Sequence, residues 1–506
     1  MTESVRIKLD LNSIDDYRLF LKIKGLPSYR FVGREAIVPM EYARYLEIDK
    51  IAPPPIEYRP ISGLFDYQRD ISDLAISKQK FAVFARCGLG KTLIMHEFAR
   101  HAQQCLGPTR RVLIVSPLMV VQQTIDEAKR FYRDTGVEFG LEQVLAKDLA
   151  RWTTQVGSFV GITNYEALTS GVPQRRLGAL ILDEASMLKS HYGKHGQQCL
   201  RLGAGLDWKL CLTGTPAPND RIEFANHAVF LDAFPTVNSF LARFFVNRGQ
   251  TNERWEIKPH ALEPFYRALS HWCIFLENPA TYGWKDNTDT IPSVNVHIHD
   301  VDLTSEQREL VGAKLGTLFA GDIGGITKRS ALAQIAKGNH DGRKIATNKP
   351  EFIRDLVDSW PEESTIIWCR FNEEQASMEA TFPDAASIQG STPIERRMEL
   401  IRDFQAGRRK QLISKPRVLG FGLNLQIATR HIFSGLHDSW EEFHQAVSRS
   451  NRVGSTMELN VHIPITPVEA PMVETVLRKA HRIQQDLEVQ ERLFKSQTIF
   501  GGKHVA

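Results

Sequence analysis

The chain has 506 residues, which is more than one hydrophobic core accounts for, so we expect about two to four domains. An apolar fraction of 42% and a charged fraction of 24% are typical of a folded globular protein and exclude a mostly disordered or collagen-like chain. The net charge of +4 is small, so any affinity for nucleic acid must come from local patches.

The cysteines and the hydropathy pattern argue against several further classes of protein. The six cysteines form no Cys-x-x-Cys pair, which argues against a zinc ribbon or a disulfide scaffold and fits a reducing cytosol. The N-terminal sequence lacks the apolar core of a secretory signal, and no apolar run approaches the roughly 20 residues that span a bilayer. We therefore expect a cytoplasmic protein with no membrane partner.

Residues 1–55 predict a small α+β domain. Apolar residues alternate with polar ones from Val5 to Leu11, as in a strand, and YRFVGREAIVP predicts a hairpin that turns at Gly33. Prolines 53–55 then form a stiff linker. Basic side chains between residues 17 and 34 are candidates for DNA contacts: Lys22, Lys24, Arg30 and Arg34, together with Arg18. The interleaved aromatic rings are either the core of this domain or a surface that stacks on unpaired bases.

The rest of the chain predicts an α/β protein with two parallel sheets. Short apolar runs alternate with amphipathic stretches over residues 56–235, and the same rhythm returns over 294–470. Residues 236–293 are rich in aromatics and lack this rhythm, so we expect a helical insertion whose rings form its core rather than a surface that stacks on DNA. A C-terminal helix and tail are expected over residues 471–506.

The strongest chemical signal is FAVFARCGLGKT at residues 81–92. A strand leads into a glycine-bearing loop, and a helix begins near Lys91, which is the arrangement that holds phosphate. Lys91 would neutralise the β- and γ-phosphates, and the Thr92 hydroxyl would ligate Mg²⁺. The first position of the usual pattern is Ala85 instead of glycine.

Two adjacent carboxylates end a wholly apolar strand about 90 residues further on, in LGALILDEAS. Asp183 would hold Mg²⁺, and Glu184 would polarise the attacking water. Such a pair is often only a solvated strand end, but after a phosphate loop in the same sheet it favours ATP hydrolysis.

A third element lies in the second α/β region, in WEEFHQAVSRSNRVGS. Gln445, Arg449 and Arg452 are three to four residues apart, so a helix would carry them on one face. Arginines directed at a γ-phosphate stabilise the transition state of hydrolysis. By itself the pattern is also that of an ordinary basic helix face.

These motifs and their order resemble superfamily 2 helicases of the Snf2-like type, in particular compact phage and bacterial forms. FDYQRD resembles the adenine-reading motif, and IVSPLMVVQQ, ITNYEAL, LTGTPAPN, TIIWCRF, GFGLNLQ and QAVSRSNRVG resemble the remaining helicase motifs. The resemblance covers about residues 60–465 and implies two RecA-like domains in tandem. It also implies ATP and Mg²⁺ as cofactors, DNA as partner, a motor that acts as a monomer, and a bacterial or phage-infected cytoplasm.

The resemblance assigns roles residue by residue. ATP contacts fall on Gln68, Gly88, Leu89, Gly90, Lys91, Thr92 and Gln445; metal binding on Thr92 and Asp183; coupling on Ser186, Thr213, Gly214 and Thr215; and catalysis on Lys91, Glu184, Arg449 and Arg452. DNA contacts fall on Ser116, Pro117, Asn164, Tyr165, Arg370, Gly422 and Asn424. The second motif reads DEAS, so coupling that the family's histidine provides falls to Ser186 or is lost.

We therefore expect an ATP-dependent translocase that remodels branched duplex DNA by fork regression, branch migration or annealing. The region before the motor loosely resembles the small recognition modules of annealing helicases, on GLPSYRFVGREAIVPMEY. One alternative is a helicase for RNA or simple duplexes. Another class, a passive nucleic-acid clamp with a decayed ATPase, is disfavoured by the intact Lys91, Asp183 and Glu184.

Overall fold

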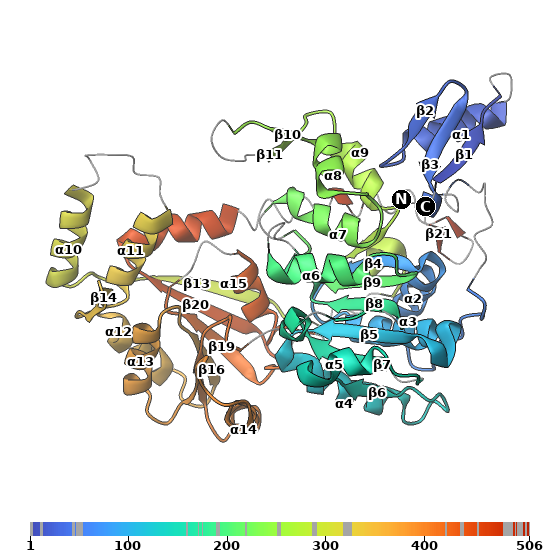
Figure 1. Ribbon diagram of the computed structural model, residues 1–506. Helices are drawn as coiled ribbons and strands as arrows, with labels where there is room; N and C mark the ends of the chain where they lie inside the picture. Colours follow the sequence, from blue (N-terminus) through green and yellow to red (C-terminus); the bar gives the residue numbers. More distant parts are fainter. Residues whose placement is uncertain are drawn as a thin grey trace. The chain divides into compact units, whose positions relative to one another are not determined.

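The fold is described from a computed structural model of the chain (Figure 1). It describes residues 4–10, 14–42, 46, 54–157, 160–170, 172–174, 176–188, 193–217, 220–249, 255–285, 291–316, 326–419, 423–435, 440–452, 455–478, 489–490, 492, 499–500 and 503–504. The chain forms two compact units, one of residues 1–287 with 485–506 and one of residues 288–484.

Unit 1 is built on a seven-stranded sheet in the order β12-β4-β9-β8-β5-β7-β6, in which every neighbouring pair is parallel. The strands are β4 (Lys80–Ala85), β5 (Arg111–Ser116), β6 (Leu141–Gln143), β7 (Val160–Asn164), β8 (Leu177–Asp183), β9 (Trp208–Thr213) and β12 (Cys273–Leu276). All seven carboxyl ends therefore meet at one edge of this sheet, where ligands bind in open α/β folds.

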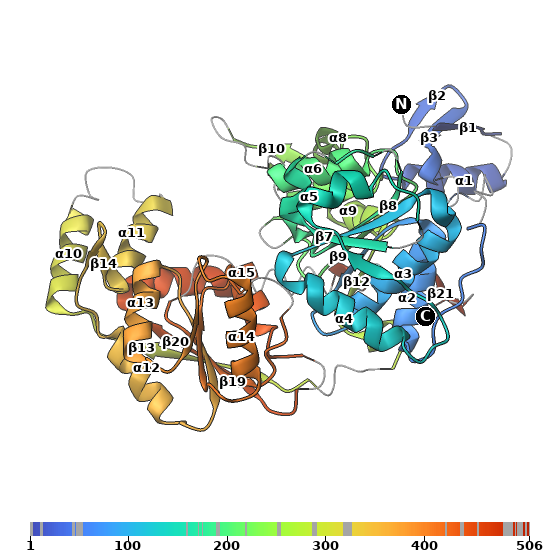
Figure 2. The same cartoon turned by 60° about the horizontal axis from the view of Figure 1, so that its bottom comes forward.

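Both faces of this sheet are buried, which explains its wholly apolar strands. Along β4, Phe81 and Val83 pack into the core on one face, and Ala82 and Phe84 pack into the core on the other. The first face is covered by α2 (Asp66–Lys78), α3 (Lys91–Leu106) and α4 (Val121–Tyr132) (Figure 2). The other face packs against α6 (Lys194–Gly203), α7 (Phe224–Phe230), α8 (Val237–Phe244) and α9 (Leu262–Leu269), and α5 (Ala146–Trp152) lies near its edge.

The region expected to be a helical insertion is only partly helical. Besides α8 and α9 it contains the antiparallel pair β10 (Phe245–Asn247) and β11 (Trp255–Ile257). The expectation is wrong for β12, which pairs in parallel with β4 and belongs to the main sheet. Its short run CIFL carries too few residues for a periodic signal, and only pairing with a strand about 190 residues earlier defines it. The aromatic rings are core as expected, with Phe240 and Phe265 fully buried.

The N-terminal segment has its own three-stranded antiparallel sheet in the order β1-β3-β2. It consists of β1 (Ser4–Lys8), α1 (Ile14–Lys24), β2 (Arg30–Val32) and β3 (Glu35–Pro39). The predicted hairpin is confirmed, and Gly33 at its turn has φ +61°, which favours glycine. Ile23, Ala36 and Val38 are fully buried at the centre of a separate small core.

Unit 2 carries a six-stranded parallel sheet in the order β13-β20-β19-β16-β18-β17. The strands are β13 (Val294–Asp300), β16 (Ser364–Trp368), β17 (Ala386–Ile388), β18 (Gln411–Ser414), β19 (Ala428–Phe433) and β20 (Leu459–Ile465). Its helices are α10 (Ser305–Gly316), α11 (Ile326–Ala336), α12 (Lys349–Asp358), α13 (Asn372–Thr381), α14 (Ile394–Gln405), α15 (Trp440–Val447) and a helix over 470–478. The two parallel sheets confirm the predicted α/β class.

Two short antiparallel pairs complete the described elements, β14 (Asn339–His340) with β15 (Arg343–Lys344) and β21 (Ile499–Phe500) with β22 (Lys503–His504). All six cysteines are free thiols. Among the described residues, no helix combines the length and apolar character needed to cross a bilayer.

Candidate functional site

The phosphate loop lies between β4 and α3, as the sequence predicts. Gly88 and Gly90 both have positive φ, +91° and +67°, and Gly90 stands directly before the helix. This conformation leaves the N-terminus of α3 open at the carboxyl edge of the sheet, where its unpaired N–H groups attract an anion. The Lys91 ammonium donates to the main-chain oxygens of Ala85 at 2.6 Å and Arg86 at 3.2 Å, so it lies inside the loop that would hold the phosphates.

Gln68 on α2 supports this loop from behind. Its side chain is 1% exposed, its Oε1 accepts the Phe65 N–H at 3.0 Å, and its Nε2 donates to the Leu89 carbonyl at 3.4 Å. A Cβ at Gly90 would lie 2.2 Å from the same Nε2, so a side chain there would displace the Gln68 amide, and the φ of +67° itself favours glycine. The structure thus brings the predicted adenine-reading glutamine against the phosphate loop.

Asp183 ends β8, two strands from β4, and faces a hydroxyl from the next strand. The Ser116 Oγ at the end of β5 donates to the Asp183 Oδ2 at 2.7 Å. Burial raises the pKa of Asp183 to about 6, although the Ser116 hydrogen bond and the Lys91 charge oppose that rise. A carboxylate at the sheet edge that lacks a full counter-charge fits a site for a divalent cation.

Glu184 is held by two hydroxyl groups. Its Oε1 accepts from the Thr213 Oγ1 at 2.6 Å and from the Ser186 Oγ at 3.0 Å. Thr213 ends β9, the strand between β4 and β8, and its hydroxyl also accepts the Thr215 N–H at 3.1 Å. Glu184 has φ +53°, a left-handed conformation that is uncommon for this residue and concentrates at functional sites.

Two of the residues predicted to couple the motifs contact Glu184 directly. Ser186, in the position where the family has a histidine, and Thr213, from the following motif, meet at one carboxylate oxygen. Gly214 lies beside the loop, since a Cβ there would be 3.3 Å from the Cys87 Sγ. Movement of β9 or of the turn after β8 would therefore change the position of Glu184.

Three residues assigned to DNA from the sequence are buried within unit 1. Tyr165 is 1% exposed, and its hydroxyl donates to the Asp183 main-chain oxygen at 2.7 Å. Ser116 is fully buried against the Asp183 carboxylate, and Pro117 beside it is also buried. The Ser116 and Tyr165 hydroxyls are thus engaged at Asp183, and the assignment of DNA contacts to these three residues stays a prediction.

The remaining residues predicted to contact DNA differ in their hydrogen-bond partners. Asn164 caps the turn after β7 by accepting the Ala167 N–H at 2.8 Å. Asn424 is exposed, and its Oδ1 accepts the Gln426 N–H at 3.1 Å. The main-chain N–H of Arg370 donates to the Glu374 Oε2 at 2.7 Å. Gly422 lies outside the described residues.

The arginines of the last motif are not on a helix. α15 ends at Val447, so it carries Gln445, while Arg449 and Arg452 lie in the turn that follows. The Ser450 hydroxyl donates to the Leu425 main-chain oxygen at 2.8 Å and contacts the His431 ring, which ties the turn to β19. Hydroxyl groups that bond outside the helix compete with its continuation, and the expectation of one helical face for all three residues is wrong.

A buried network that the sequence does not signal ties the linker to α3. Glu97 is fully buried and pairs with Arg100 at 2.9 Å, and it accepts the hydroxyls of Tyr58 at 2.8 Å and Tyr132 at 2.6 Å. Arg100 in turn donates to the Arg59 main-chain oxygen at 2.8 Å. The segment that follows the proline linker is therefore fixed to the helix of the phosphate loop.

The fold and the first site are those of a phosphate-loop nucleoside triphosphatase with two parallel-sheet units. The family described as the SNF2-related domain matches residues 84–350, and the helicase conserved C-terminal domain matches residues 348–454. The first match covers more than half of the chain. The chain therefore belongs to the SNF2-related family, within the superfamily 2 helicases, and its two parallel-sheet domains are RecA-like.

Comparison with individual proteins adds two solved structures. The Sulfolobus solfataricus SWI2/SNF2 ATPase core in complex with dsDNA is similar at 18% identity and a TM-score of 0.40, covering 87% of this chain and 96% of that chain. The Sulfolobus solfataricus SWI2/SNF2 ATPase core domain is similar at 19% identity and a TM-score of 0.38, covering 88% and 93%. The comparison with curated proteins found no match.

Proposed function

We propose that this chain is an ATP-driven translocase on duplex DNA that remodels branched DNA by fork regression, branch migration or annealing. The observation that carries the ATPase is the geometry of Glu184, a carboxylate fixed by two hydroxyls in the sheet that carries the phosphate loop. The family supports DNA as the partner, and the N-terminal domain supports branched DNA as the substrate.

In this proposal each residue of the first site has one task. Lys91 and the N–H groups at the start of α3 bind the β- and γ-phosphates. Thr92 and Asp183 would hold Mg²⁺, which supplies charge neutralisation of the phosphate oxygens when bound. Glu184 orients the attacking water and accepts its proton. Thr213 and Ser186 keep the acceptor oxygen of Glu184 in place.

Glu184→Gln tests this assignment. The amide keeps the shape and the contacts with Thr213 and Ser186 but cannot accept the proton. We expect nucleotide affinity to stay near the wild-type value and turnover to fall about 10²–10⁴-fold, measured as phosphate release beside a nucleotide-binding titration. Near-normal turnover would assign the reaction to another carboxylate.

The N-terminal domain presents the cations that would meet a branched substrate. Lys22, Lys24, Arg30 and Arg34 are exposed, while the Arg18 side chain lies outside the described part of the chain. Phe20, Tyr29 and Phe31 pack against the small core, so these rings are largely structural, but Tyr17 remains 58% exposed. This leaves phosphate contact as the better supported role for the domain.

Deletion of residues 1–55 tests the branched-DNA part of the proposal. ATPase without DNA should persist, because the hydrolysis residues follow this segment, and fork binding should weaken. At roughly 0.9 per phosphate contact, loss of five cations lowers the salt slope by up to about 4–5. Lys22→Glu with Lys24→Glu should show part of this loss.

The matched control places the same charge change on exposed residues of α4 and α5, Lys129→Glu with Lys147→Glu. The measurement is a set of fork and duplex binding isotherms at several salt concentrations. Unchanged fork affinity after the deletion contradicts the recognition role. Stimulation of ATPase by RNA in preference to DNA contradicts the choice of DNA.

A further inference from the structure

A small cavity opens at the carboxyl edge of the second sheet, entirely within unit 2. Its volume is about 180 Å³, and its walls come from the ends of β16, β18 and β19 and from α15. The residues that matter for its chemistry are Trp368, Arg370, Phe371, Lys415, Phe433 and Phe443. Ligands of parallel α/β sheets bind at this edge.

One wall of the cavity is aromatic. The rings of Phe433 and Phe443 have centroids 4.8 Å apart, and Phe433 stacks on Trp368 at 6.1 Å. Phe433 and Trp368 are 3% and 1% exposed, whereas Phe371 and Phe443 are only partly buried. Phe371 and Phe443 are therefore the rings of this wall through which a planar ligand would stack.

The lining carries more positive than negative charge. Arg370, Lys415 and Arg417 line the cavity against one carboxylate, Glu442, which pairs with Arg417 at 2.6 Å. The Arg370 guanidinium lies 5.1 Å from the centre of the Phe371 ring. Aromatic surface beside cations of this kind binds a base through its face and its phosphate through charge.

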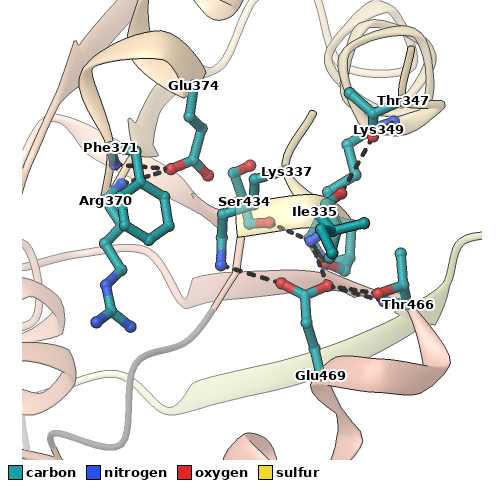
Figure 3. A network of polar contacts seen from close by, with 12 residues as sticks. Ile335, Lys337, Thr347, Lys349, Arg370, Phe371, Glu374, Ser434, Thr466 and Glu469 are labelled. Carbon is teal, nitrogen blue, oxygen red and sulfur yellow. Dashed lines mark hydrogen bonds and ion pairs between the residues drawn. The ribbon is translucent and has the colours of Figure 1, made fainter. Parts of the chain in front are cut away.

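A buried ionic network, drawn in Figure 3, lies beside Gly435, which is one of the residues that line this cavity. The side chains of Lys337 and Lys349 are 0% and 1% exposed. Their ammonium groups pair with the two oxygens of the Glu469 carboxylate, at 3.0 and 2.7 Å. Burial raises the pKa of Glu469, but the charges of Lys349 and Lys337 outweigh it and hold that pKa at about 2. Gly435 lines the cavity directly against the network, since a Cβ there would lie 2.4 Å from the Lys337 Nζ.

The turn that carries Arg370 and Phe371 is fixed in the same way. The Glu374 Oε2 accepts the main-chain N–H groups of Arg370 at 2.7 Å and Phe371 at 3.1 Å, as Figure 3 shows. The Lys337 ammonium lies 5.7 Å from the centre of the Phe371 ring. Buried charges thus hold the turn at Arg370 and the segment at Gly435, two of the segments that line the cavity, which favours a preformed site.

The size of the cavity selects among ligands. Pockets for drug-sized ligands run to roughly 300–1,000 Å³, so about 180 Å³ suits one ring system but not a whole nucleoside triphosphate. A cavity of this size also does not admit the stacked bases of a duplex. A single unstacked base whose phosphate stays at the rim satisfies both limits.

We propose that this cavity holds one unpaired nucleobase of the DNA, with its phosphate at Arg370 and Lys415. The base stacks on Phe371 and Phe443. This inference rests on the proposed function, because it requires DNA to reach unit 2. It gives the motor a way to recognise the unpaired bases of a junction separately from the N-terminal domain.

The experiment compares three duplexes of one sequence: fully paired, with one extrahelical adenine, and with an extrahelical abasic site. The abasic duplex controls for the bend that a bulge introduces. We expect the wild-type chain to bind the adenine bulge about five- to a hundredfold more tightly than the abasic bulge, the range that stacking of one base provides.

Phe443→Leu removes the ring while keeping an apolar side chain, and we expect it to lose this preference. Phe443→Tyr should retain it. The matched control is Phe382→Leu, because Phe382 packs on the core of the same unit away from the cavity and should leave the preference unchanged. Phe371→Leu supplies a second test of the same wall should Phe443→Leu fail to fold, as judged by thermal melting.

The inference is overturned if the wild type binds the adenine and abasic bulges with equal affinity. It is also overturned if Phe443→Leu and Phe371→Leu both retain the preference for adenine. The fully paired duplex separates this outcome from failure of the proposed function. A chain that is stimulated by paired duplex but ignores the base retains its translocase assignment, whereas a chain that neither binds paired duplex nor responds to it loses both.

Discussion

The carboxyl edges of the two parallel sheets differ in the side chains they carry. On the first sheet, small polar groups from neighbouring strands converge on two carboxylates, Asp183 and Glu184. On the second sheet the same edge holds aromatic rings and cations around a cavity. The same architecture thus builds a site for phosphate chemistry in one unit and a candidate site for planar bases in the other, because the fold fixes the edge and the strand ends decide its chemistry.

Among the substitutions that test this comparison, Lys91→Ala should have the largest effect on ATP turnover. Removal of the one ammonium inside the phosphate loop should abolish turnover, since the phosphates lose their point charge in the site. Phosphate release measures it, with Lys147→Ala on the exposed side of α5 as control. Residual turnover within tenfold of wild type would contradict the assignment of phosphate chemistry to the edge of the first sheet.

Arg449→Ala and Arg452→Ala ask whether the second unit contributes to hydrolysis as well. Arginines directed at a γ-phosphate are worth about 10³–10⁵ in rate, so kcat should fall by that order with nucleotide affinity nearly intact. Arg449 is only 2% exposed, so thermal melting and Arg449→Lys must accompany the kinetics. Lost affinity at unchanged kcat would make both arginines structural.

Thr213→Val tests the hydrogen bond that holds Glu184 at the edge of the first sheet. The substitution keeps the shape and removes the hydroxyl that donates to Glu184, so the carboxylate should lose alignment but not chemistry. We expect kcat to fall about ten- to a hundredfold. Ser186→Ala, which removes the longer of the two bonds, should cost less. Equal loss in both variants would contradict the ranking by distance.

The pH dependence of Asp183 provides the smallest effect. Burial raises its pKa from 3.8 to about 6, so the folded protein binds this proton more tightly than the unfolded chain. The contribution of Asp183 to the free energy of unfolding therefore falls as pH rises between these values and stays low above them. Conversely, a divalent cation needs the ionised form, so its apparent affinity should drop about tenfold per pH unit below about pH 6.

Mg²⁺ titrations of nucleotide binding across this pH range test the expectation. Asp183→Asn should remove most of the Mg²⁺ dependence and leave only the pH dependence that titration of the nucleotide phosphates themselves produces. A wild-type affinity that stays constant down to about pH 4 would show that the carboxyl is ionised throughout and that burial does not dominate its pKa.

The sequence alone determined the phosphate loop, the carboxylate pair and the α/β rhythm of both units. These signals are local: a glycine pattern between a strand and a helix, two acids after an apolar run, and short buried strands. It also located the hairpin at Gly33, where one residue sets the backbone conformation. Such features depend on a few neighbouring residues, so they can be predicted from the local sequence.

Only the tertiary structure decided how distant segments meet. The pairing of β12 with β4, the hydroxyls of Ser116 and Tyr165 at Asp183, and the turn that ends α15 before Arg449 all depend on contacts between residues far apart in sequence. The cavity of unit 2 is a further case, since four separate segments supply its walls. Packing across strands sets which face a side chain takes and what it bonds, and no local pattern encodes that choice.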